Sequence, residues 1–370
     1  MRPRVAHVLE AVGGGTARHL VDIARHAPAS DHEVVLPPER IGGLSDETAI
    51  EQLRDAGATV HVLSMRRTPW APRNALALAR LRHLLRRVRP DVVHGHSSIG
   101  GLLARTASVG LRSPRIYTPN GITQVRAGVL VERRLRPLTD RFVAVSPSEG
   151  ELAVEIGLID RARLVVIPNG VELERPRAVE LRARLGISAT VPLVGTVSRL
   201  VHQKAPEDFV AACAVVGSAM RDVHFVLIGA GEQQALVDEA VAASGLGERF
   251  HQVLSLPGAG GALGELDVFA LSSRFEGGPY SPLEAMRAET AVVLTDAVGN
   301  RDVVEHGVSG VLVPVGDPEA MGAAIVALLR DAPRRRALAV SGRERLGERF
   351  DVRSMGAQLD ALYEELASGA

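Results

Sequence analysis

The sequence predicts an α/β protein with two doubly wound domains, each built around a parallel sheet. Its 370 residues exceed the length that a single hydrophobic core usually serves. Short runs rich in valine, isoleucine and leucine alternate with amphipathic stretches long enough for helices. This alternation is typical of parallel strands with helices on both faces. It begins near the N-terminus and starts again near residue 191, which indicates a second domain of similar size.

The first half of the chain contains six predicted strands. The first of them is followed by a glycine turn, and helical spacing of apolar residues predicts helices between several of the others. The predicted strands lie at 5–12, 33–37, 59–64, 91–97, 115–121 and 141–146, and the predicted helices at 17–27, 47–57 and 74–88.

The stretch 168–190 contains two prolines and mixed charges without clean periodicity, so we expect the domain boundary there. The strand pattern then restarts, and a helix is expected after Pro206. We assign 1–172 and 173–352 to the two domains and 353–370 to a final helical segment. The strands predicted after the boundary lie at 191–198, 223–229, 267–273, 291–297 and 310–314, and the closing helices at 318–330, 333–348 and 353–367.

The overall composition excludes several classes of protein. Forty-three basic residues balance forty-three acidic ones, which argues against a nucleic-acid partner. The single cysteine, Cys213, lies in an apolar run, so we expect it buried and reduced. No apolar stretch approaches the ~20 residues that cross a bilayer, and no cleavable signal is evident. We therefore expect a cytoplasmic protein, as a monomer or a homodimer.

Lys204 is the only lysine in the chain, and every other basic residue except the histidines is arginine. Such a bias is typical of GC-rich bacterial genomes, so the one lysine draws attention. Arg199 and Lys204 lie on the loop after the predicted strand 191–198. Two cations at this spacing can clamp a diphosphate, although a solvated loop is the favoured explanation when the pair is taken alone.

Two glycine turns follow predicted strands. Gly13, Gly14 and Gly15 come after the first strand, and Gly229 and Gly231 come after the strand 223–229. Glycine lets backbone amides approach an anion, and a helix N-terminus favours negative charge. The first turn lacks the GxGxxG spacing and its acidic partner, so a dinucleotide site is not indicated. A tight turn without a ligand remains the alternative for both.

The segment after the predicted strand 267–273 contains two glutamates with different explanations. Ser281, Pro282 and Glu284 match a helix capping box with proline at the first helical position, which would explain Glu284 without a ligand. Glu276 stands beside two glycines at the strand end and has no such explanation. We therefore interpret Glu276 as a candidate functional residue.

His94 and His96 lie on one face of a predicted strand because side chains alternate along a strand. Only His96 is near the carboxyl end, where ligands of such sheets bind. No cysteine, aspartate or glutamate nearby completes a ligand set, so no metal is predicted. We expect His94 to be hydrogen-bonded in the core and His96 to be functional.

Taken in order, these features resemble the large retaining glycosyltransferase family that includes sucrose synthase and the phosphatidylinositol mannosyltransferases. The glycine turns, DVVHGH, the pair Arg199 and Lys204, and the two glutamates separated by seven residues all contribute. So do VIPNGVE (166–172), DVFALSSRFEGGPYSPLEAM (267–286) and GNRDVVEHGVSGVLVPVGDPEAM (299–321). The resemblance covers nearly the whole chain.

The resemblance implies a GT-B fold, in which two Rossmann-like domains face each other across a cleft and the last helix returns to the first domain. The first domain would bind the acceptor and the second the nucleotide-sugar donor. Arg199 and Lys204 would bind the donor diphosphate, Glu276 would contact the transferred sugar, and Glu284 would hold the ribose hydroxyls. His96 would lie beside the sugar and the acceptor. The remaining implied donor contacts are Gly14, Gly15, Gly229, Gly231, Gly277, Gly278, Pro279, Tyr280 and Ser281.

Two departures from the family pattern concern the substrates. Many relatives have Gly-Phe-Gly after the first glutamate, whereas this chain has Gly278, Pro279 and Tyr280 following Gly277. Pro279 removes one amide donor from that loop. Many relatives also have histidine where this chain has Asn120, a position on the acceptor side.

The resemblance therefore implies a metal-independent enzyme without a cofactor, in which fixed cations stabilise the leaving diphosphate. A UDP-sugar is the favoured donor, and a small-molecule hydroxyl compound is the acceptor. A secondary metabolite such as an aminocyclitol antibiotic precursor is our first candidate, and a polysaccharide or glycolipid precursor is the alternative. A nucleotide-sugar 2-epimerase shares the fold, but the paired glutamates argue against it. The arginine-rich segments 74–88 and 129–138 can contact a membrane surface, although solvated faces are favoured.

Overall fold

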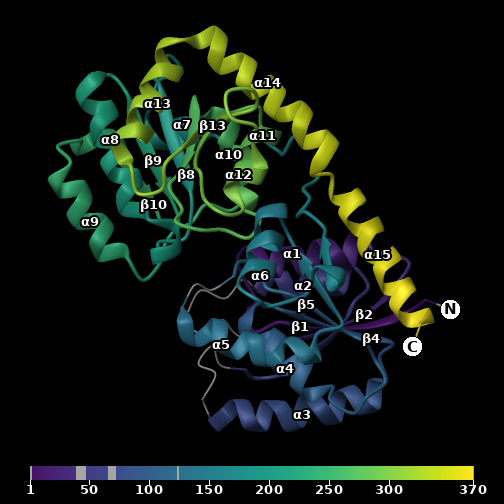
Figure 1. Cartoon of the computed structure of the whole chain (residues 1–370). Helices are drawn as coiled ribbons and strands as arrows, with labels where there is room; N and C mark the ends of the chain where they lie inside the picture. Colours follow the sequence, from purple (N-terminus) through teal and green to yellow (C-terminus); the bar gives the residue numbers. More distant parts are fainter. Residues whose placement is uncertain (1, 39–46, 66–71, 123–124, 370) are drawn as a thin grey trace. The chain divides into compact units, whose positions relative to one another are not determined.

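The computed structural model describes residues 2–38, 47–65, 72–122 and 125–369. It divides into two compact units (Figure 1). The first unit comprises residues 1–170 together with 352–370, and the second unit comprises residues 171–351. No helix within the described ranges is long and apolar enough to span a bilayer.

The first unit contains a seven-stranded parallel sheet with the order β3-β2-β1-β4-β5-β6-β7. Most of its strand residues are buried, because helices cover both faces. The strands are β1 (Arg4–Val8), β2 (Asp31–Leu36), β3 (Thr59–Val62), β4 (Val92–His96), β5 (Arg115–Thr118), β6 (Arg141–Ala144) and β7 (Leu164–Val166). The helices are α1 (Gly15–His26), α2 (Glu47–Asp55), α3 (Pro72–Val88), α4 (Ser98–Ala107), α5 (Arg126–Leu135), α6 (Pro147–Glu155) and α15 (Val352–Ser368), with 3-10 turns η1 (Arg136–Leu138) and η2 (Arg161–Arg163).

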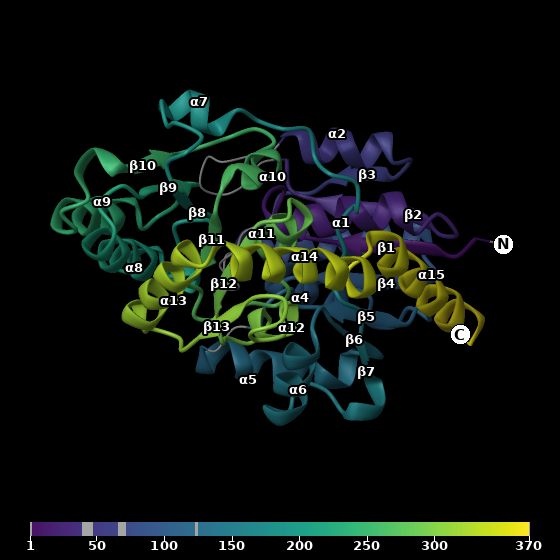
Figure 2. The ribbon, with the colours of Figure 1, turned by 90° about the horizontal axis from the view of Figure 1, so that it is seen from above.

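The final helix, α15, belongs to the first unit, as the resemblance implied (Figure 2). Its apolar face joins a core cluster that includes Tyr363 and Ile23 of α1. Asp360 accepts hydrogen bonds from Ser30 Oγ at 2.7 Å and from a neighbouring amide. A Cβ on Gly356 would lie 1.8 Å from His26 O, so only glycine permits this close approach of α15 to the end of α1.

The second unit contains a six-stranded parallel sheet with the order β10-β9-β8-β11-β12-β13. One hydrophobic cluster covers each face. The strands are β8 (Leu193–Val197), β9 (His224–Ile228), β10 (Phe250–Val253), β11 (Val268–Leu271), β12 (Ala291–Thr295) and β13 (Val311–Val313). The helices are α7 (Leu181–Leu185), α8 (Pro206–Ala219), α9 (Gln234–Ala243), α10 (Ala259–Ala262), α11 (Tyr280–Arg287), α12 (Asn300–Val303), α13 (Pro318–Arg330) and α14 (Ala332–Arg349), with 3-10 turns η3 (His202–Lys204), η4 (Gly247–Arg249) and η5 (Leu263–Glu265).

Both sheets reverse their strand order at one point. In the first unit β1 lies between β2 and β4, and in the second unit β8 lies between β9 and β11. Chain segments leaving two such neighbouring strands diverge, and ligands of doubly wound sheets bind at the carboxyl ends of these strands. The loops after β1 and β4, and those after β8 and β11, are therefore the places to examine for function.

Two short strands were missed by the sequence analysis. They are β7 and β10, each at one edge of its sheet. The sequence of β10, Phe-His-Gln-Val, is only half apolar, and its last three residues are partly exposed. Edge strands bury less surface than central ones, so their hydrophobic pattern is weak.

The start of α11 corrects another prediction. The helix begins at Tyr280, its N-cap is Pro279, and no side chain caps it. Ser281 and Glu284 therefore do not form the predicted capping box. Pro282 occupies the third helical position, where the missing amide would have no intrahelical partner. Glu284 lies in the body of the helix, so capping does not explain it.

Candidate functional site

The loop after β8 places Lys204 at the switch point of the second sheet. It contains η3 and ends at Ala205, which has φ 45° and ψ 55° and precedes Pro206 at the start of α8. This left-handed conformation is unfavourable for a non-glycine residue and has to be held by its surroundings. Ser272, just after β11, provides an anchor, because its Oγ donates to Ala205 O at 2.8 Å and to Lys204 O at 3.1 Å.

Glu276 forms an ion pair with the Lys204 ammonium at this switch point. Lys204 Nζ lies 2.5 Å from Glu276 Oε1, and Ser273 Oγ donates to the same oxygen at 2.5 Å. Gln203 Nε2 donates to Oε2 at 3.2 Å. The carboxylate is buried, and its backbone amide donates to Val298 O at 2.9 Å. The structure thus joins two predicted site residues from loops 72 positions apart.

Arg199 lies on the same loop as Lys204, two residues after β8, and is half-buried. The loop rests on the glycine turn after β9. A Cβ on Gly229 would lie 1.9 Å from Ser198 O, and one on Gly231 would lie 2.2 Å from Leu200 O. The amide of Gly229 donates to Val253 O at 2.8 Å, so it is not open to a phosphate. These glycines support the Arg199 loop by lacking side chains.

The segment from Gly277 to Ser281 leads from Glu276 into α11. Gly277, Pro279 and Tyr280 are buried, whereas Gly278 and Ser281 are half-buried. The turn at Gly299, before α12, packs directly on this segment. A Cβ there would lie 2.7 Å from Gly277 O and 2.8 Å from Glu276 Cβ, and φ is +82°.

Glu284 projects from α11 toward Gly260. A Cβ added to Gly260 would meet Glu284 Oε1 at 3.2 Å and Arg287 Nη2 at 3.1 Å. Glu284 is half-buried and lies close to α10, the first helix after β10. Its proposed contact with ribose stays a prediction.

Gly14 is the N-cap of α1 in the first unit, with φ 78° and ψ −170°. No atom of the described residues lies within 4 Å of a Cβ added there, so the backbone conformation is what requires glycine. Gly14 and Gly15 are both exposed, and no side chain caps the helix. The first amides of α1 are thus accessible to an anion, as expected for a phosphate contact.

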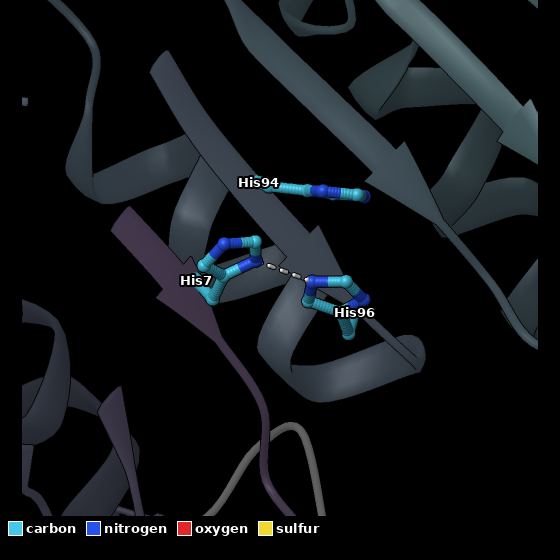
Figure 3. Close-up of side chains that lie close together, drawn as sticks. All are labelled: His7, His94 and His96. Atoms are coloured by element: carbon cyan, nitrogen blue, oxygen red, sulfur yellow. Dashed lines mark hydrogen bonds between the residues drawn. The ribbon is translucent and has the colours of Figure 1, made fainter. Parts of the chain in front are cut away.

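The histidines of the first unit meet at the ends of β1 and β4 (Figure 3). His96 is fully buried at the last position of β4, and its Nε2 lies 3.1 Å from Nδ1 of His7 in β1. His7 Nε2 lies 3.0 Å from His32 Nδ1, and His32 Nε2 lies 2.8 Å from Ala27 O. His94 Nδ1 lies 2.9 Å from the Tyr363 hydroxyl, and its Nε2 lies 2.8 Å from Thr118 Oγ1. The prediction of a hydrogen-bonded core role for His94 is confirmed.

The sequence of each half of the chain matches a model of a known protein family. Residues 13–175 match the model described as Glycosyltransferase Family 4, and residues 179–345 match the model described as Glycosyl transferases group 1. The chain is a glycosyltransferase of this family.

Individual relatives agree with the family assignment. The chain is 31% identical over 277 residues to 2-deoxystreptamine N-acetyl-D-glucosaminyltransferase of Streptomyces fradiae, covering 68% of this chain and 66% of the relative. It is 30% identical over 311 residues to D-inositol 3-phosphate glycosyltransferase of Geodermatophilus obscurus, covering 76% and 68%.

A solved structure agrees with the fold. Anabaena HepE, in complex with UDP and glucose, superposes with a TM-score of 0.84 at 20% identity, covering 98% of this chain and 100% of HepE. The likeness establishes the GT-B fold with two Rossmann-like domains.

Burial favours the neutral form of the histidines in the core of the first unit. It lowers the pKa of His7, His94 and His96 well below the usual histidine value, and neighbouring histidines lower it further. Burial also lowers the pKa of His19 to about 4. At physiological pH these rings therefore act as neutral hydrogen-bonding groups.

His7, His94 and His96 also form a geometric metal-site candidate, since one nitrogen of each lies within 4.8 Å of the others. However, both ring nitrogens of His7 and of His94 are already hydrogen-bonded, and the partner of His7 Nδ1 is His96 itself. A neutral imidazole has a single lone pair to offer, so a metal would have to displace these bonds. Metal independence stays a prediction for this glycosyltransferase.

Asn120 follows β5, the neighbour of β4, and has φ 54°. Glu149 holds this loop, since Gly121 N donates to its Oε1 at 2.6 Å. Asn120 Nδ2 is buried without a hydrogen-bond partner among residues whose positions are described. A role for Asn120 on the acceptor side stays a prediction.

Several supporting residues were missed by the sequence analysis. Glu10, two residues after β1, accepts from Ser97 Oγ at 2.7 Å and from Gly100 N at 2.9 Å, which fixes the start of α4. Gln203 and Ser273 hold Glu276, and Gly299 packs on it. The position of the polar residues in the sequence could have identified them. Each lies on a loop that follows one of the strands at the two switch points, β1, β4, β8 and β11.

Proposed function

We propose that this glycosyltransferase moves a sugar from a UDP-sugar to a hydroxyl acceptor, with retention of configuration and without a metal. The contact between Lys204 and Glu276, at the switch point of the second sheet, carries the proposal. The presence of UDP in the HepE structure, a protein of the same fold, supports uridine as the base.

The Lys204 ammonium has three N–H donors and, among the described residues, uses one of them on Glu276. The others are available to the phosphates of a bound donor. When the glycosyl phosphate bond breaks, negative charge develops on the leaving diphosphate, and a fixed cation stabilises it. Arg199, on the same loop, adds a second positive charge. Two fixed cations in these positions support catalysis without a metal ion.

Glu276 has one oxygen left for the sugar. Its Oε1 already accepts from Lys204 and Ser273, and within the residues that the structure describes Oε2 accepts only from Gln203. A carboxylate oxygen has two lone pairs, so Oε2 can accept one hydroxyl of the transferred sugar.

The same contacts make Glu276 a weak nucleophile, because three donors stabilise its negative charge. We propose that no side chain forms a covalent intermediate. The acceptor hydroxyl attacks the anomeric carbon on the face that the diphosphate leaves, the C–O bond to the phosphate breaks, and the leaving phosphate takes the acceptor proton.

For the acceptor we propose an aminocyclitol or a related cyclitol. The two relatives above are named for 2-deoxystreptamine and inositol phosphate, both of which are polyhydroxylated six-membered carbon rings. A polysaccharide or glycolipid precursor remains the alternative acceptor.

The test is to incubate the protein with UDP-glucose or UDP-N-acetylglucosamine and 2-deoxystreptamine, with and without EDTA. We expect UDP release that depends on the acceptor, an α-linked product by NMR, and the same rate with EDTA. A β-linked product would refute retention, loss of activity with EDTA would refute metal independence, and release of a free epimerised sugar would assign an epimerase.

A further inference from the structure

Hydrogen bonds connect three histidine rings in a row, from Ala27 O to His96 at the end of β4. We infer that His32 and His7 are positioning residues that hold His96 as its Nε2–H tautomer, so that His96 Nδ1 accepts a hydrogen bond from a substrate hydroxyl. The inference rests on the proposed function for the identity of that substrate. We call His32, His7 and His96 the histidine relay.

The direction of the relay follows from its first acceptor. Ala27 O can only accept, so His32 Nε2, at 2.8 Å, must carry a proton. A neutral imidazole carries one proton, so His32 Nδ1 is an acceptor. His7 Nε2, at 3.0 Å, must therefore donate to it, which leaves His7 Nδ1 as an acceptor.

The last link determines the state of His96. His96 Nε2 lies 3.1 Å from the acceptor nitrogen of His7, so it must donate and carry the proton of the ring. The Nδ1 atom of His96 is then a bare lone pair. One carbonyl oxygen, three hydrogen bonds away, thereby determines which nitrogen of His96 can accept.

The surroundings keep the relay neutral, as this logic requires. All three rings are buried, and burial is the largest cause of a lowered pKa for each of them. His94 and His19 face His96, and a positive charge on either would lower its pKa further. Asp360 and Asp31 lie near His32 and act in the opposite direction, but burial outweighs them.

The terminal atom has a vacant hydrogen-bonding position. His96 Nδ1 is buried and has no hydrogen-bond partner in the part of the chain that the structure describes. A buried polar atom without a partner is unfavourable, and a ligand that supplies an O–H removes this deficit. A bare lone pair accepts from a hydroxyl and repels an ether or carbonyl oxygen, so the relay selects for a free hydroxyl at one position of a substrate.

Histidine NMR tests the relay without any activity. In protein labelled with 15N at the histidine rings, at neutral pH, we expect His32, His7 and His96 all to be Nε2–H tautomers. His32→Asn, His7→Asn and His96→Asn assign the signals. An Nδ1–H tautomer of His96, or a charged His96 ring at pH 7, would overturn the inference whether or not the enzyme transfers sugar.

A matched pair of variants tests the functional consequence. Leucine and asparagine have similar shapes, but only the oxygen of asparagine can accept from His96 Nε2–H. With UDP-glucose, His7→Leu should lower kcat/KM about 10-fold, and His7→Asn should recover most of it. With the monodeoxy UDP-glucose or deoxygenated acceptor that lacks the recognised hydroxyl, His7→Leu and wild type should react equally.

The control is His224→Leu, which removes a similar histidine contact in the second unit, where His224 Nδ1 lies 3.0 Å from His251 Nε2. It should leave the discrimination between hydroxyl and deoxy substrates unchanged. Equal losses for His7→Leu and His7→Asn on every substrate would reduce His7 to a core residue and overturn the inference. So would one zinc ion per chain that is lost in His7→Leu, measured by plasma mass spectrometry. Absence of UDP-sugar turnover in the wild type would refute the proposed function, and the NMR result would still stand.

Discussion

The two units share one strand order and place very different chemistry at the same point of it. In the second unit the loops after β8 and β11 bring together a lysine, a glutamate and their polar supports. In the first unit the ends of β1 and β4 hold neutral imidazoles. The comparison teaches that topology determines where a site forms, whereas the residues at the strand ends determine what it does. Fixed charge suits a leaving diphosphate, and neutral lone pairs suit hydroxyl groups.

Loss of the lysine in the second unit should have the largest effect on activity. Lys204→Ala removes the cation beside Glu276, and we expect kcat to fall by about 100-fold or more, because one such contact contributes on the order of 3 kcal/mol to the transition state. UDP-release kinetics measure this. Arg161→Ala, at an exposed ion pair with Glu151, is the control and should change little. A turnover near wild type for Lys204→Ala would refute the role of the lysine.

Acid should destabilise the first unit more than the second. Folding lowers the pKa of His7, His94 and His96 below the ordinary histidine value of 6.5. Below pH 6.5 these rings therefore bind more protons in the unfolded chain than in the folded protein. Their contribution is complete above that pH and is lost as the pH falls, at up to about 1.4 kcal/mol per pH unit for each ring. Asp22, whose pKa is raised to about 6 by burial, partly opposes this loss between pH 6 and 4.

Hydrogen exchange at pH 7 and pH 5 measures the effect in each unit. We expect amides of the first unit to lose more protection than those of the second, where the described histidines with a lowered pKa, His224 and His251, are only partly buried. Asp22→Asn should make the first unit still more acid-labile, because it removes the opposing group. An equal loss in both units would contradict the proposed neutrality of the histidines.

One glycine in each unit allows a comparison of backbone strain alone with strain plus steric contact. Both Gly14 and Gly229 have positive φ, at 78° and 144°. An alanine at Gly14 meets no atom of the described chain and should cost about 1–3 kcal/mol in backbone strain. An alanine at Gly229 adds a Cβ that would lie 1.9 Å from Ser198 O, so its cost should be larger by about 1–3 kcal/mol. Urea unfolding of both variants measures the difference, and a smaller loss for Gly229→Ala would contradict it.

The smallest effect concerns two serines near helix starts. Ser146 is the N-cap of α6 and accepts from Glu149 N at 3.2 Å, so Ser146→Ala should cost about 1 kcal/mol. Ser281 lies inside α11 and caps nothing, so Ser281→Ala should change the free energy of unfolding by less than about 0.5 kcal/mol. Thermal unfolding compares the two. If Ser281→Ala lost as much stability as Ser146→Ala, Ser281 would be a helix cap after all, as the sequence predicted.

The sequence predicts the central strands and their carboxyl ends well, because runs such as VPLVGTVS and DVVHGHS are apolar and end in turn residues. It locates Lys204, Glu276 and His96 on such ends for the same reason. No local sequence pattern predicts the order of the strands. The three-dimensional structure is therefore needed to find the contact between Lys204 and Glu276, and likewise the relay from His32 through His7 to His96. The start of α11 was misplaced because Ser281 and Glu284 have capping-box spacing by coincidence, and Tyr280 carries no helix-start signal.

The membership of α15 in the first unit has a consequence for synthesis. The second unit is one continuous segment, whereas the core of the first unit includes Met355, Leu359 and Tyr363 from the last helix. On the ribosome the second unit can therefore complete its core before the first, the reverse of the usual N-terminal-first order. Until α15 leaves the exit tunnel, apolar surface around Val5 and Ile23 stays uncovered, and a nascent chain stalled before residue 352 should be a substrate for chaperones.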